Sequence, residues 1–325
     1  MESTGAADAR PTLLVLRALK LGDLLVAVPA LHALRRAFPA HRLVYAGPAW
    51  LADIVGLVGG FELLPAALDK PFAVTQGTVD IAVNLHGRGP ESTSLLESAG
   101  PRRMIAHGTA SGPPWVEQMH ERERWTRLLR WHGIEADPRE VRLERPKMSG
   151  LQGTEAQASG VQATGPRPAA VVHVGAAFGS RLWPEKRFAA VASALDGAGH
   201  DVVFTGSADE RDRALRVARQ ARLPDSAVVA GTQRLADFAA TVADAGVVVS
   251  ADTGAAHLAT AYHRPSVVLF GPAPPERWGP PAGPHVVLTR AELRRGDVFA
   301  DEPDPALLGV GVQDVLAALR GLGLL

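Results

Sequence analysis

Residues 247–270 read VVVSADTGAAHLATAYHRPSVVLF, and this stretch decides the fold class. Two short apolar runs, 247–250 and 266–270, have the character of buried parallel strands. The residues between them, 254–262, have the composition of a helix. A strand, a helix and a second strand in this order form a βαβ unit, whose two strands lie parallel. The stretch therefore predicts an α/β architecture.

The same alternation of strand and helix continues through the rest of the chain. In the C-terminal half, further strands are predicted at 170–174, 201–205 and 227–229, and helices at 186–198, 209–221, 235–243 and 312–319, the last packing back across the domains. In the N-terminal half, strands are predicted at 13–16, 43–45 and 81–84, and helices after residue 23, at 50–57 and at 120–132. Pro29 is expected early in the first of these helices, where its missing N–H is tolerated. The repetition in both halves predicts two doubly wound parallel sheets, as two Rossmann-like domains facing a central cleft.

The composition changes abruptly between residues 149 and 168, where Gly, Gln, Ser and Thr replace large apolar residues. Such a segment is typical of an interdomain linker or an exposed loop. We therefore predict an N-terminal domain over 1–150, a linker over 151–168 and a C-terminal domain over 169–325. A chain of 325 residues is long enough to build two such cores.

Charge and composition exclude several classes of protein. Lys and Arg together number 34, as do Asp and Glu, so no net charge attracts nucleic acid or an anionic membrane. The absence of cysteine excludes disulfides and thiolate metal sites. Residues 1–11 are small and polar, unlike a signal peptide, and no apolar run reaches the ~18 residues of a membrane helix. We expect a cytoplasmic monomer without a transmembrane segment and without a nucleic-acid partner.

Candidate ligand-binding residues are those on the loops that follow the strands. In doubly wound sheets, ligands bind beyond the carboxyl ends of the strands. Neither G-x-G-x-x-G nor G-x-x-x-x-G-K-[ST] follows any predicted strand. The interpretation as a dehydrogenase or as a P-loop protein therefore loses its main support.

Gly22 and Asp23 follow the first predicted strand, at the start of a helix. A carboxylate at this place stabilises the helix, because free N–H groups and the helix dipole attract negative charge. The same carboxylate at the edge of a cleft is a candidate general base that removes a proton from an acceptor hydroxyl. The residues alone leave both interpretations open.

Residues 250–257, SADTGAAH, carry a second candidate site. The small residues allow a ligand to approach the backbone, and Asp252 and Thr253 cap the helix that follows. A helix start offers free N–H groups and a partial positive charge, which suits a pyrophosphate. His257 lies one helical turn from Thr253 and Gly254, so it is expected to face the same ligand. The alternative is an ordinary capped helix with an incidental histidine.

Two further strand-end loops carry charged candidates. Arg181 leaves a Gly-rich loop, and Trp183 is expected to anchor that loop to the body of the domain. A guanidinium here would bind phosphate oxygens and stabilise a departing nucleoside diphosphate; the alternative is a solvated surface arginine. Glu210 follows another strand, where it either accepts hydrogen bonds from a ribose or caps a charged helix.

Seven segments together resemble glycosyltransferase family 9, the lipopolysaccharide heptosyltransferase family, over nearly the whole chain. They read RALKLGDLLVAVPAL (17–31), NLHG (84–87), HERER (120–124), RLWPEKRF (181–188), GSADERDR (206–213), GTQRL (231–235) and ADTGAAHLA (251–259). The combination of Gly-Asp near the start, Trp-Pro after the linker and Asp-Thr-Gly-x-x-His late in the chain is specific.

The resemblance implies a GT-B fold and an inverting, metal-independent glycosyltransferase whose donor substrate is ADP-heptose, with no cofactor. It implies that Asp23 is the general base and that the C-terminal domain binds the donor. Arg181 stands where the family usually has lysine, so it keeps the charge but changes its geometry. Asp23 and Arg181 are therefore the predicted catalytic residues, and no metal ligand is predicted.

The remaining predicted site residues fall into two groups. The donor site comprises Gly175, Ser180, Arg181, Gly206, Glu210, Gln233, Asp252, Thr253, Gly254 and His257, with Glu210 on the ribose. The acceptor site in the N-terminal domain comprises Gly22, Asn84, His86 and His120. The acceptor is either a small molecule or an envelope glycolipid, and the second would place the protein at the inner face of the inner membrane. Arg102, Arg103 and the Arg-rich segment 122–130 either contact an anionic acceptor or are solvated surface residues.

Two other functions remain open at this point. A nucleotide-sugar epimerase of GT-B shape would share the fold but need no acceptor. A non-catalytic protein on the same scaffold would bind the nucleotide sugar without turnover. Incubation with the donor alone identifies the epimerase by a changed sugar, and any turnover of the donor excludes the non-catalytic protein.

Overall fold

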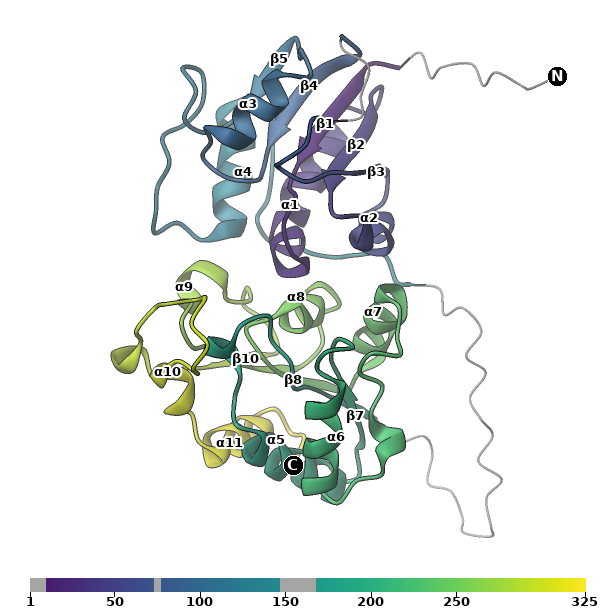
Figure 1. Ribbon diagram of the computed structural model, residues 1–325, viewed down its shortest axis with the longest axis vertical. Coiled ribbons are helices and arrows are strands. Elements are labelled where there is room, and N and C mark those ends of the chain that lie inside the picture. The colour runs from purple at the N-terminus through teal and green to yellow at the C-terminus, as the bar shows by residue number, and fades with distance from the viewer. Residues whose placement is uncertain (1–9, 73–76, 147–167) are drawn as a thin grey trace, which may run out of the picture. The chain divides into compact units, whose positions relative to one another are not determined.

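The computed structural model describes residues 10–72, 77–146 and 168–325. The chain divides into two compact units, Met1–Glu144 and Arg145–Leu325, each built around its own sheet (Figure 1). Apart from Pro168, the predicted linker at 151–168 lies outside the described residues. The two units are described separately below.

The first unit is a five-stranded parallel sheet in the order β3-β2-β1-β4-β5. Its strands are β1 (Thr12–Leu16), β2 (Arg42–Gly47), β3 (Phe61–Pro65), β4 (Val79–Asn84) and β5 (Arg103–Ile105). Its helices are α1 (Leu21–Ala37), α2 (Ala52–Val58), α3 (Glu91–Glu97) and α4 (Glu121–Trp131), with the 3-10 turn η1 (Ala49–Leu51). All five residues of β1 are buried, as expected for the central strand of a sheet covered on both faces. Helices α1 and α4 pack against each other.

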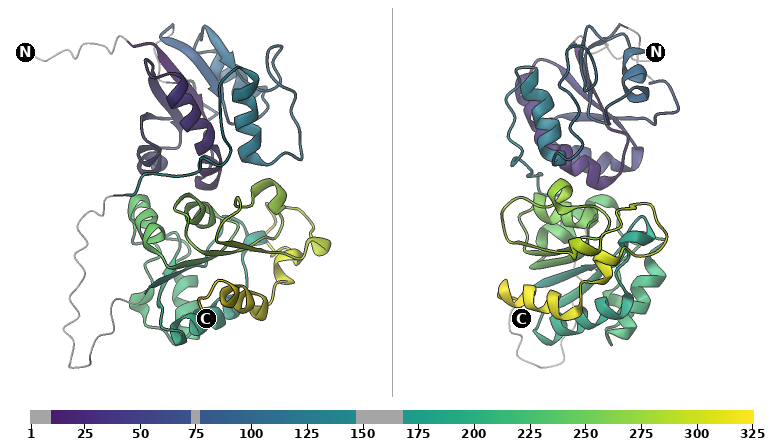
Figure 2. Two further views of the ribbon diagram at one scale, coloured as in Figure 1. Left: turned by 180° about the vertical axis from the view of Figure 1, so that it is seen from behind. Right: turned by 90° about the vertical axis from the view of Figure 1, so that its left-hand side faces the viewer.

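The second unit is also a five-stranded parallel sheet, in the order β10-β9-β8-β6-β7. Its strands are β6 (Ala169–His173), β7 (Asp201–Thr205), β8 (Val247–Ala251), β9 (Ser266–Leu269) and β10 (His285–Leu288). Its helices are α5 (Glu185–Gly197), α6 (Arg211–Gln220), α7 (Leu235–Asp244), α8 (Gly254–Ala261), α9 (Pro275–Trp278), α10 (Pro305–Leu308) and α11 (Val312–Gly321). The 3-10 turns are η2 (Gly179–Arg181), η3 (Asp225–Ala227) and η4 (Ala291–Leu293). The two sheets, with helices layered on both faces (Figure 2), confirm the predicted α/β class.

Both sheets have a point where the strand order reverses. In the first unit the reversal falls between β1 and β4, and in the second between β6 and β8. Loops at the carboxyl ends of the two strands at such a point diverge to opposite faces and leave a crevice, which is where doubly wound sheets bind ligands. The loop after β1 carries Asp23, the loop after β6 carries Arg181, and β8 leads into Asp252. The topology therefore places the predicted site residues where a ligand is expected.

The core of the second unit fixes the loop that carries Arg181. Trp183 is fully buried, and its indole N–H donates to the backbone oxygen of Val310 at 3.0 Å. Phe188 packs edge-on against the Trp183 ring, with 5.0 Å between ring centroids. The expectation that Trp183 anchors this loop is confirmed.

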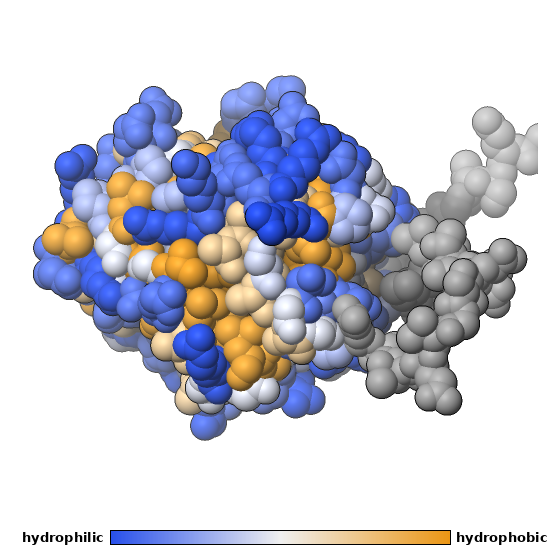
Figure 3. Space-filling view, turned by 90° about the horizontal axis from the view of Figure 1, so that it is seen from below, coloured by the Kyte–Doolittle hydropathy of each residue, from blue (hydrophilic) through white to orange (hydrophobic). Residues whose placement is uncertain are grey.

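The face of the protein seen from below in Figure 1 shows apolar residues within a largely polar surface (Figure 3).

The structure corrects two predictions about local elements. Residues 227–229 do not form a strand: they follow η3, and one isolated bridge joins Val228 to Phe204. Pro29 does not lie early in its helix, because α1 begins at Leu21 and Pro29 is its ninth residue. At that position the ring cannot donate to the carbonyl of Leu25, so the helix forgoes one internal hydrogen bond and is held by tertiary packing instead.

Strands β3, β5 and β10 were not predicted. Of these, β5 has three residues, RMI, and β3 ends on Pro65, so neither shows the apolar run of a buried strand. Strand β10 is only half buried along its length. All three are outer strands: β3 and β5 are the two edges of the first sheet, and β10 is one edge of the second. An outer strand needs fewer apolar residues, because one of its sides lacks a neighbouring strand.

Candidate active site

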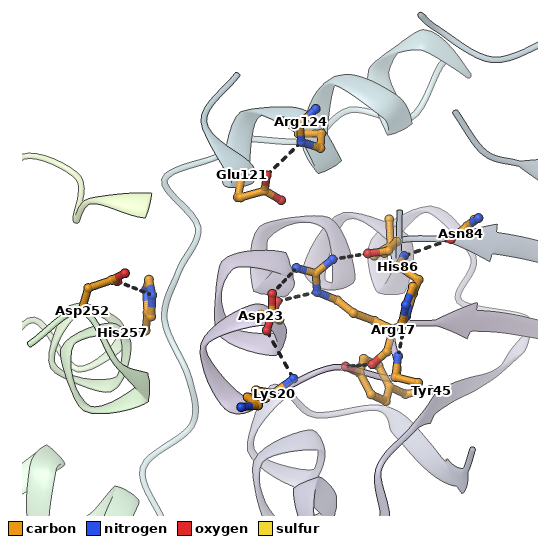
Figure 4. Close-up of polar contacts among 12 residues, drawn as sticks. Arg17, Lys20, Asp23, Tyr45, Asn84, His86, Glu121, Arg124, Asp252 and His257 are labelled. Carbon is orange, nitrogen blue, oxygen red and sulfur yellow. Dashed lines mark hydrogen bonds and ion pairs between the residues drawn. The ribbon is translucent and has the colours of Figure 1, made fainter. Parts of the chain in front are cut away.

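Arg17, at the carboxyl end of β1, connects three segments of the first unit (Figure 4). Its side chain is 1% exposed, and its guanidinium donates to the backbone oxygens of Asp23 and Leu85. One terminal nitrogen lies 3.6 Å from a carboxylate oxygen of Asp23. The guanidinium also lies over the Trp125 ring of α4, 4.8 Å from its centroid. A buried cation needs such partners, so Arg17 holds the segments after β1 and β4 in a fixed geometry.

Asp23 occupies the third position of α1, and its carboxylate is 26% exposed. The backbone N–H of Lys20 donates to its Oδ2 at 3.3 Å, which is the carboxylate half of a capping box. The capping interpretation of Asp23 is therefore confirmed as a contact. It does not exclude the catalytic one, because the exposed part of the carboxylate can still accept a proton from a bound hydroxyl. Gly22 lies in the same first turn of α1.

Asn84 ends β4 and is completely buried. Its amide donates to the hydroxyls of Ser92 at 2.9 Å and Thr93 at 3.0 Å, on α3. Its oxygen accepts the backbone N–H of His86 at 3.0 Å. Asn84 therefore shapes the loop after β4, and the structure places its side chain away from solvent.

His86 lies beside the segment that carries Asp23. Its Nδ1 accepts the backbone N–H of Ala18 at 3.2 Å, so the neutral ring carries its proton on Nε2. Burial lowers the pKa of His86, and the nearby charge of Arg17 lowers it further. The ring is thus neutral near pH 7 and can donate one hydrogen bond from Nε2.

The HERER segment at 120–124 has a structural role. His120 is the N-cap of α4, and its Nδ1 accepts the backbone N–H of Arg122 at 3.1 Å. Arg124 is completely buried, pairs with Glu121 at 3.0 Å and stacks on Trp115 at 3.8 Å from the ring centroid. Within the segment 122–130, the interpretation as a solvated helix face is therefore wrong for Arg122 and Arg124, because both are buried.

In the second unit, the side chains of Arg181, Asp252 and His257 lie in a row across the strand reversal. A terminal nitrogen of Arg181 lies 3.9 Å from Asp252, and Nε2 of His257 lies 3.8 Å from the other oxygen of Asp252. The carboxylate is 6% exposed, whereas the Arg181 side chain is 24% exposed. Asp252 is thus the more buried of these two residues, and the Arg181 guanidinium reaches the surface.

Three buried polar atoms of Arg181 and of the residues next to Asp252 lack a hydrogen-bond partner among the described residues. They are Nε of Arg181 and the hydroxyls of Ser250 and Thr253. Thr253 is the N-cap of α8, but its side chain makes no capping hydrogen bond. Buried polar groups without partners are rare, and a cluster of them is explained when a ligand supplies the missing acceptors. Donors of this kind beside a helix start match the oxygens of a phosphate. Gly254 opens α8 at the same place.

Glu210 sits against two glycines from neighbouring strand-end loops. A Cβ at Gly175 would lie 1.9 Å from the Glu210 carboxyl carbon, and one at Gly206 would lie 3.0 Å from Oε2. The backbone N–H of Ser207 donates to Oε2 at 2.6 Å. Only glycine at 175 leaves room for the carboxylate, so the structure brings these three predicted residues together.

Two predicted donor residues are occupied with internal contacts. Ser180 is buried, and its hydroxyl donates to the backbone oxygen of Val298 at 2.9 Å. Gln233 donates to the hydroxyl of Thr241 at 2.6 Å, on α7. Their side chains hold η2 and the segment before α7 in place, and any contact of Ser180 with a ligand would come through the backbone it fixes.

The sequence did not indicate Arg17 or His173 as site residues. His173 ends β6, its Nδ1 lies 3.0 Å from the Thr205 hydroxyl, and its ring lies 5.6 Å from that of Phe238. Burial lowers the pKa of His173, and the charge of Glu210 opposes that effect. A polar residue at the end of an apolar strand was the available signal. It is weak, because such residues are common at strand ends.

Within 10–72, 77–146 and 168–325, no three His, Asp or Glu side chains are grouped as metal ligands would be. No helix formed by these residues is long and apolar enough to span a membrane.

Comparison with known proteins gives a consistent set of relatives. The model of "Glycosyltransferase family 9 (heptosyltransferase)" matches residues 109–299, more than half of the chain. Lipopolysaccharide heptosyltransferase 2 of Escherichia coli K12 is 31% identical over 160 residues, which cover 46% of this chain and 44% of that protein. The aligned part of the chain therefore spans less than half the length of that relative.

Two solved structures share the fold over nearly the full length. A family 9 glycosyl transferase from Veillonella parvula superposes with a TM-score of 0.73 at 18% identity, covering 97% of both chains. The E. coli ADP-heptose lipopolysaccharide heptosyltransferase II superposes with a TM-score of 0.71 at 19% identity, covering 96% of this chain and 98% of that one.

Proposed function

Because the chain belongs to glycosyltransferase family 9 (heptosyltransferase), we propose that it transfers a glycosyl group from a nucleoside-diphosphate sugar to a hydroxyl group of an acceptor. Membership confirms the resemblance drawn from the seven sequence segments. The observation that carries the proposal is the cluster at the strand reversal of the second sheet. There Nε of Arg181 and the hydroxyls of Ser250 and Thr253 are buried without a hydrogen-bond partner among the described residues, beside the start of α8.

The second unit is proposed to bind the donor. Arg181 and the first N–H groups of α8 hold the diphosphate, because a guanidinium and a helix start both favour phosphate oxygens. Glu210, in the space left by Gly175 and Gly206, accepts hydrogen bonds from the ribose hydroxyls. ADP-heptose is the proposed donor, since one protein of the same fold is named for that compound.

The first unit is proposed to supply the general base. The acceptor oxygen attacks the anomeric carbon from the face opposite the diphosphate, the bond from that carbon to the diphosphate oxygen breaks, and the hydroxyl proton passes to Asp23. Attack from the opposite face inverts the configuration. Arg181 and the α8 start stabilise the negative charge that develops on the leaving nucleoside diphosphate. Arg181 and the α8 start supply the positive charge that stabilises the leaving group, so we propose that the transfer is metal-independent.

The acceptor is proposed to be either a small molecule or an envelope glycolipid. In the second case the enzyme would work in the cytoplasm at the inner membrane face.

The test is an ADP-release assay with ADP-heptose and a panel of acceptors, with products identified by mass spectrometry and their anomeric configuration by NMR. We expect ADP release that depends on acceptor, an inverted glycoside, and activity that survives EDTA. A changed sugar in the donor-alone reaction would identify an epimerase instead. Loss of activity in EDTA that Mg²⁺ or Mn²⁺ restores would overturn the metal-independent step.

A further inference from the structure

Residues 295–304 lie between η4 and α10 of the second unit and pack against η2, the turn that carries Arg181. We call residues 295–304 the η2 brace. The brace and η2 are far apart in the sequence, since Ser180 and Val298, which contact each other, are separated by 118 positions. None of the residues assigned above to the donor site belongs to the brace.

Ser180, the residue before Arg181, is bound to the brace through its backbone N–H, its backbone oxygen and its hydroxyl. The N–H donates to the backbone oxygen of Ala300 at 2.8 Å, and the hydroxyl donates to that of Val298 at 2.9 Å. The backbone oxygen of Ser180 accepts the N–H of Asp304 at 3.0 Å. Ser180 is completely buried, so water does not replace these partners. The peptide that leads into Arg181 is therefore held by the brace.

The two residues before Ser180 also contact the brace. A Cβ at Gly179 would overlap the backbone oxygen of Asp301, so the two backbones touch at this point. The Phe178 ring packs edge-on against the ring of Phe299, with 5.0 Å between ring centroids. The brace thus contacts three consecutive residues, 178–180, on the amino side of Arg181.

Asp304 maintains the shape of the brace. Its carboxylate accepts the backbone N–H groups of Arg295 at 3.1 Å, Gly296 at 3.2 Å and Ala306 at 2.9 Å. Asp304 is only 4% exposed, and a buried carboxylate needs donors of this kind. Because Arg295 begins the brace and Asp304 ends it, these hydrogen bonds join the two ends of the segment.

The Arg181 side chain receives little orientation from its own contacts. One terminal nitrogen lies 3.9 Å from Asp252, beyond hydrogen-bond distance, and Nε has no hydrogen-bond partner among the described residues. Ordering a long side chain when a ligand binds opposes binding, because rotamer freedom is lost. The direction in which the guanidinium points therefore depends on the backbone from which the side chain starts, and the brace fixes that backbone.

We propose that the η2 brace positions Arg181 for the diphosphate of the donor, with Asp304 as the positioning residue that maintains the brace. The inference rests on the proposed function, in which Arg181 binds the diphosphate. It adds a dependence of phosphate affinity on residues 295–304, which act through the backbone of η2 and not by contact with the ligand. A nucleoside without phosphate does not use Arg181, so its affinity should not depend on the brace.

The test measures the Kd of ADP and of adenosine by calorimetry on full-length variants. Gly179→Ala forces η2 and the brace apart, because the added Cβ overlaps the Asp301 oxygen. We expect ADP to bind about three- to tenfold more weakly, a smaller loss than in Arg181→Ala, and adenosine to bind as in the wild type. Phe299→Ala should act in the same direction with a smaller effect. Phe299 is 70% exposed, so this variant leaves the core of the unit intact.

Asp304→Ala should weaken ADP in the same way and lower the melting temperature, because three backbone N–H groups lose their acceptor. Asp304→Asn keeps one oxygen for these groups and should recover part of both losses. Leu293→Ala is the matched control for Phe299→Ala, since Leu293 is 48% exposed but lies in η4, outside the brace. Gly197→Ala, with nothing within 4 Å of the added Cβ, is the control for Gly179→Ala. Both controls should bind ADP as the wild type does.

A double-mutant cycle separates the positioning of Arg181 from a general loss of stability. Gly179→Ala should weaken ADP no further once Arg181 is replaced by alanine, because no guanidinium is then left to position. The proposal is overturned by equal weakening of ADP and adenosine, or by the same effect of Gly179→Ala with and without Arg181. It is also overturned by wild-type affinity for ADP in Gly179→Ala or in Asp304→Ala.

The same measurements distinguish this inference from the proposed function. If Arg181→Ala weakens ADP but the brace variants do not, the brace does not position Arg181, and the donor assignment stands. If Arg181→Ala binds ADP as tightly as the wild type, the donor assignment is wrong and the inference falls with it.

Discussion

At the scale of single residues, Asp23 caps a helix and is also the proposed general base. Its Oδ2 accepts the Lys20 N–H at the helix start, while its other oxygen faces the guanidinium of Arg17. A helix start orients the carboxylate, and a quarter of its surface stays exposed for a substrate. The capping contact therefore supports the proposed chemistry by holding the base in place.

Asp23→Asn should abolish transfer, because an amide cannot take up the proton. Loss of a general base typically costs about 10²–10⁴ in rate. The amide oxygen still caps the helix, so the melting temperature and the Kd for ADP should stay close to wild type. Turnover, melting temperature and ADP affinity are measured on one preparation. Near-normal turnover would mean that Asp23 is only a helix cap.

Arg17→Met should lower kcat and the melting temperature while leaving the Kd for ADP unchanged. Methionine fills similar volume but leaves the carbonyls of Asp23 and Leu85 without their donor, which costs about 1–3 kcal/mol for each buried group. Arg17→Lys should recover part of the stability and less of the activity, since one ammonium cannot reach both carbonyls in the same fork geometry. Equal kcat in Arg17→Met and wild type would show that this arginine does not position the base.

Arg181→Ala should weaken ADP but not adenosine. A charge-assisted hydrogen bond contributes about 1.5–3 kcal/mol, which corresponds to roughly 10- to 150-fold in Kd. Because Arg181 is 24% exposed, the lower end of that range is expected. Calorimetry with adenosine, AMP and ADP separates a phosphate contact from a nucleoside contact. An unchanged Kd for ADP would refute the assignment of Arg181 to the diphosphate.

At the scale of the elements, the surroundings of Glu210 depend on how closely β6, β7 and α6 approach at their ends. Gly175 follows β6, Gly206 follows β7, and Glu210 leads into α6. The carboxylate occupies the space that any other side chain at 175 would fill. The position of the Glu210 carboxylate is thus set by the spacing of two strand ends.

Gly175→Ala should therefore weaken adenosine, AMP and ADP alike, by displacing the Glu210 carboxylate. The added Cβ would lie 1.9 Å from the carboxyl carbon, so the Glu210 side chain must move. Gly206→Ala, with a nearest approach of 3.0 Å, should have a smaller effect. Gly197→Ala, in α5 with nothing within 4 Å of the added Cβ, is the control. Equal affinity in Gly175→Ala and wild type would place the ribose elsewhere.

At the scale of the whole molecule, the proposed function assigns the donor to one unit and the base to the other. Both units have parallel sheets with a strand reversal, so topology by itself would allow a nucleotide in either. The cluster of unpartnered donors near Arg181 favours the second unit.

ADP at 100 times its Kd should stabilise the protein by about 2.7 kcal/mol, since it binds only the folded chain. In hydrogen exchange on the full chain, we expect ADP to slow exchange in peptides covering 174–181, 206–210 and 252–257. Peptides covering 17–31 serve as the internal control and should be unaffected. Protection confined to the first unit would refute the donor assignment.

The sequence by itself determined the architecture and the location of the candidate site. Short apolar runs alternating with helical segments are local patterns, because each strand of a covered parallel sheet is buried whatever its partners are. The order of residues along the chain also indicated the loops after those strands as the site, and these loops carry Asp23, Arg181, Glu210 and Asp252. Residues 227–229 and Pro29 were misplaced, because an edge bridge and a helix start depend on neighbours that a local window does not contain.

Only the tertiary structure decided which residues meet. Arg17 reaches Leu85, 68 positions along the chain, and becomes a buried positioning residue through that contact. Gly175 and Glu210 come together because β6 and β7 are neighbours. A residue's burial and its partners are set by chain segments far apart in sequence. Charge, size and polarity could be read directly from the sequence, but the contacts that assign those properties to a site could not.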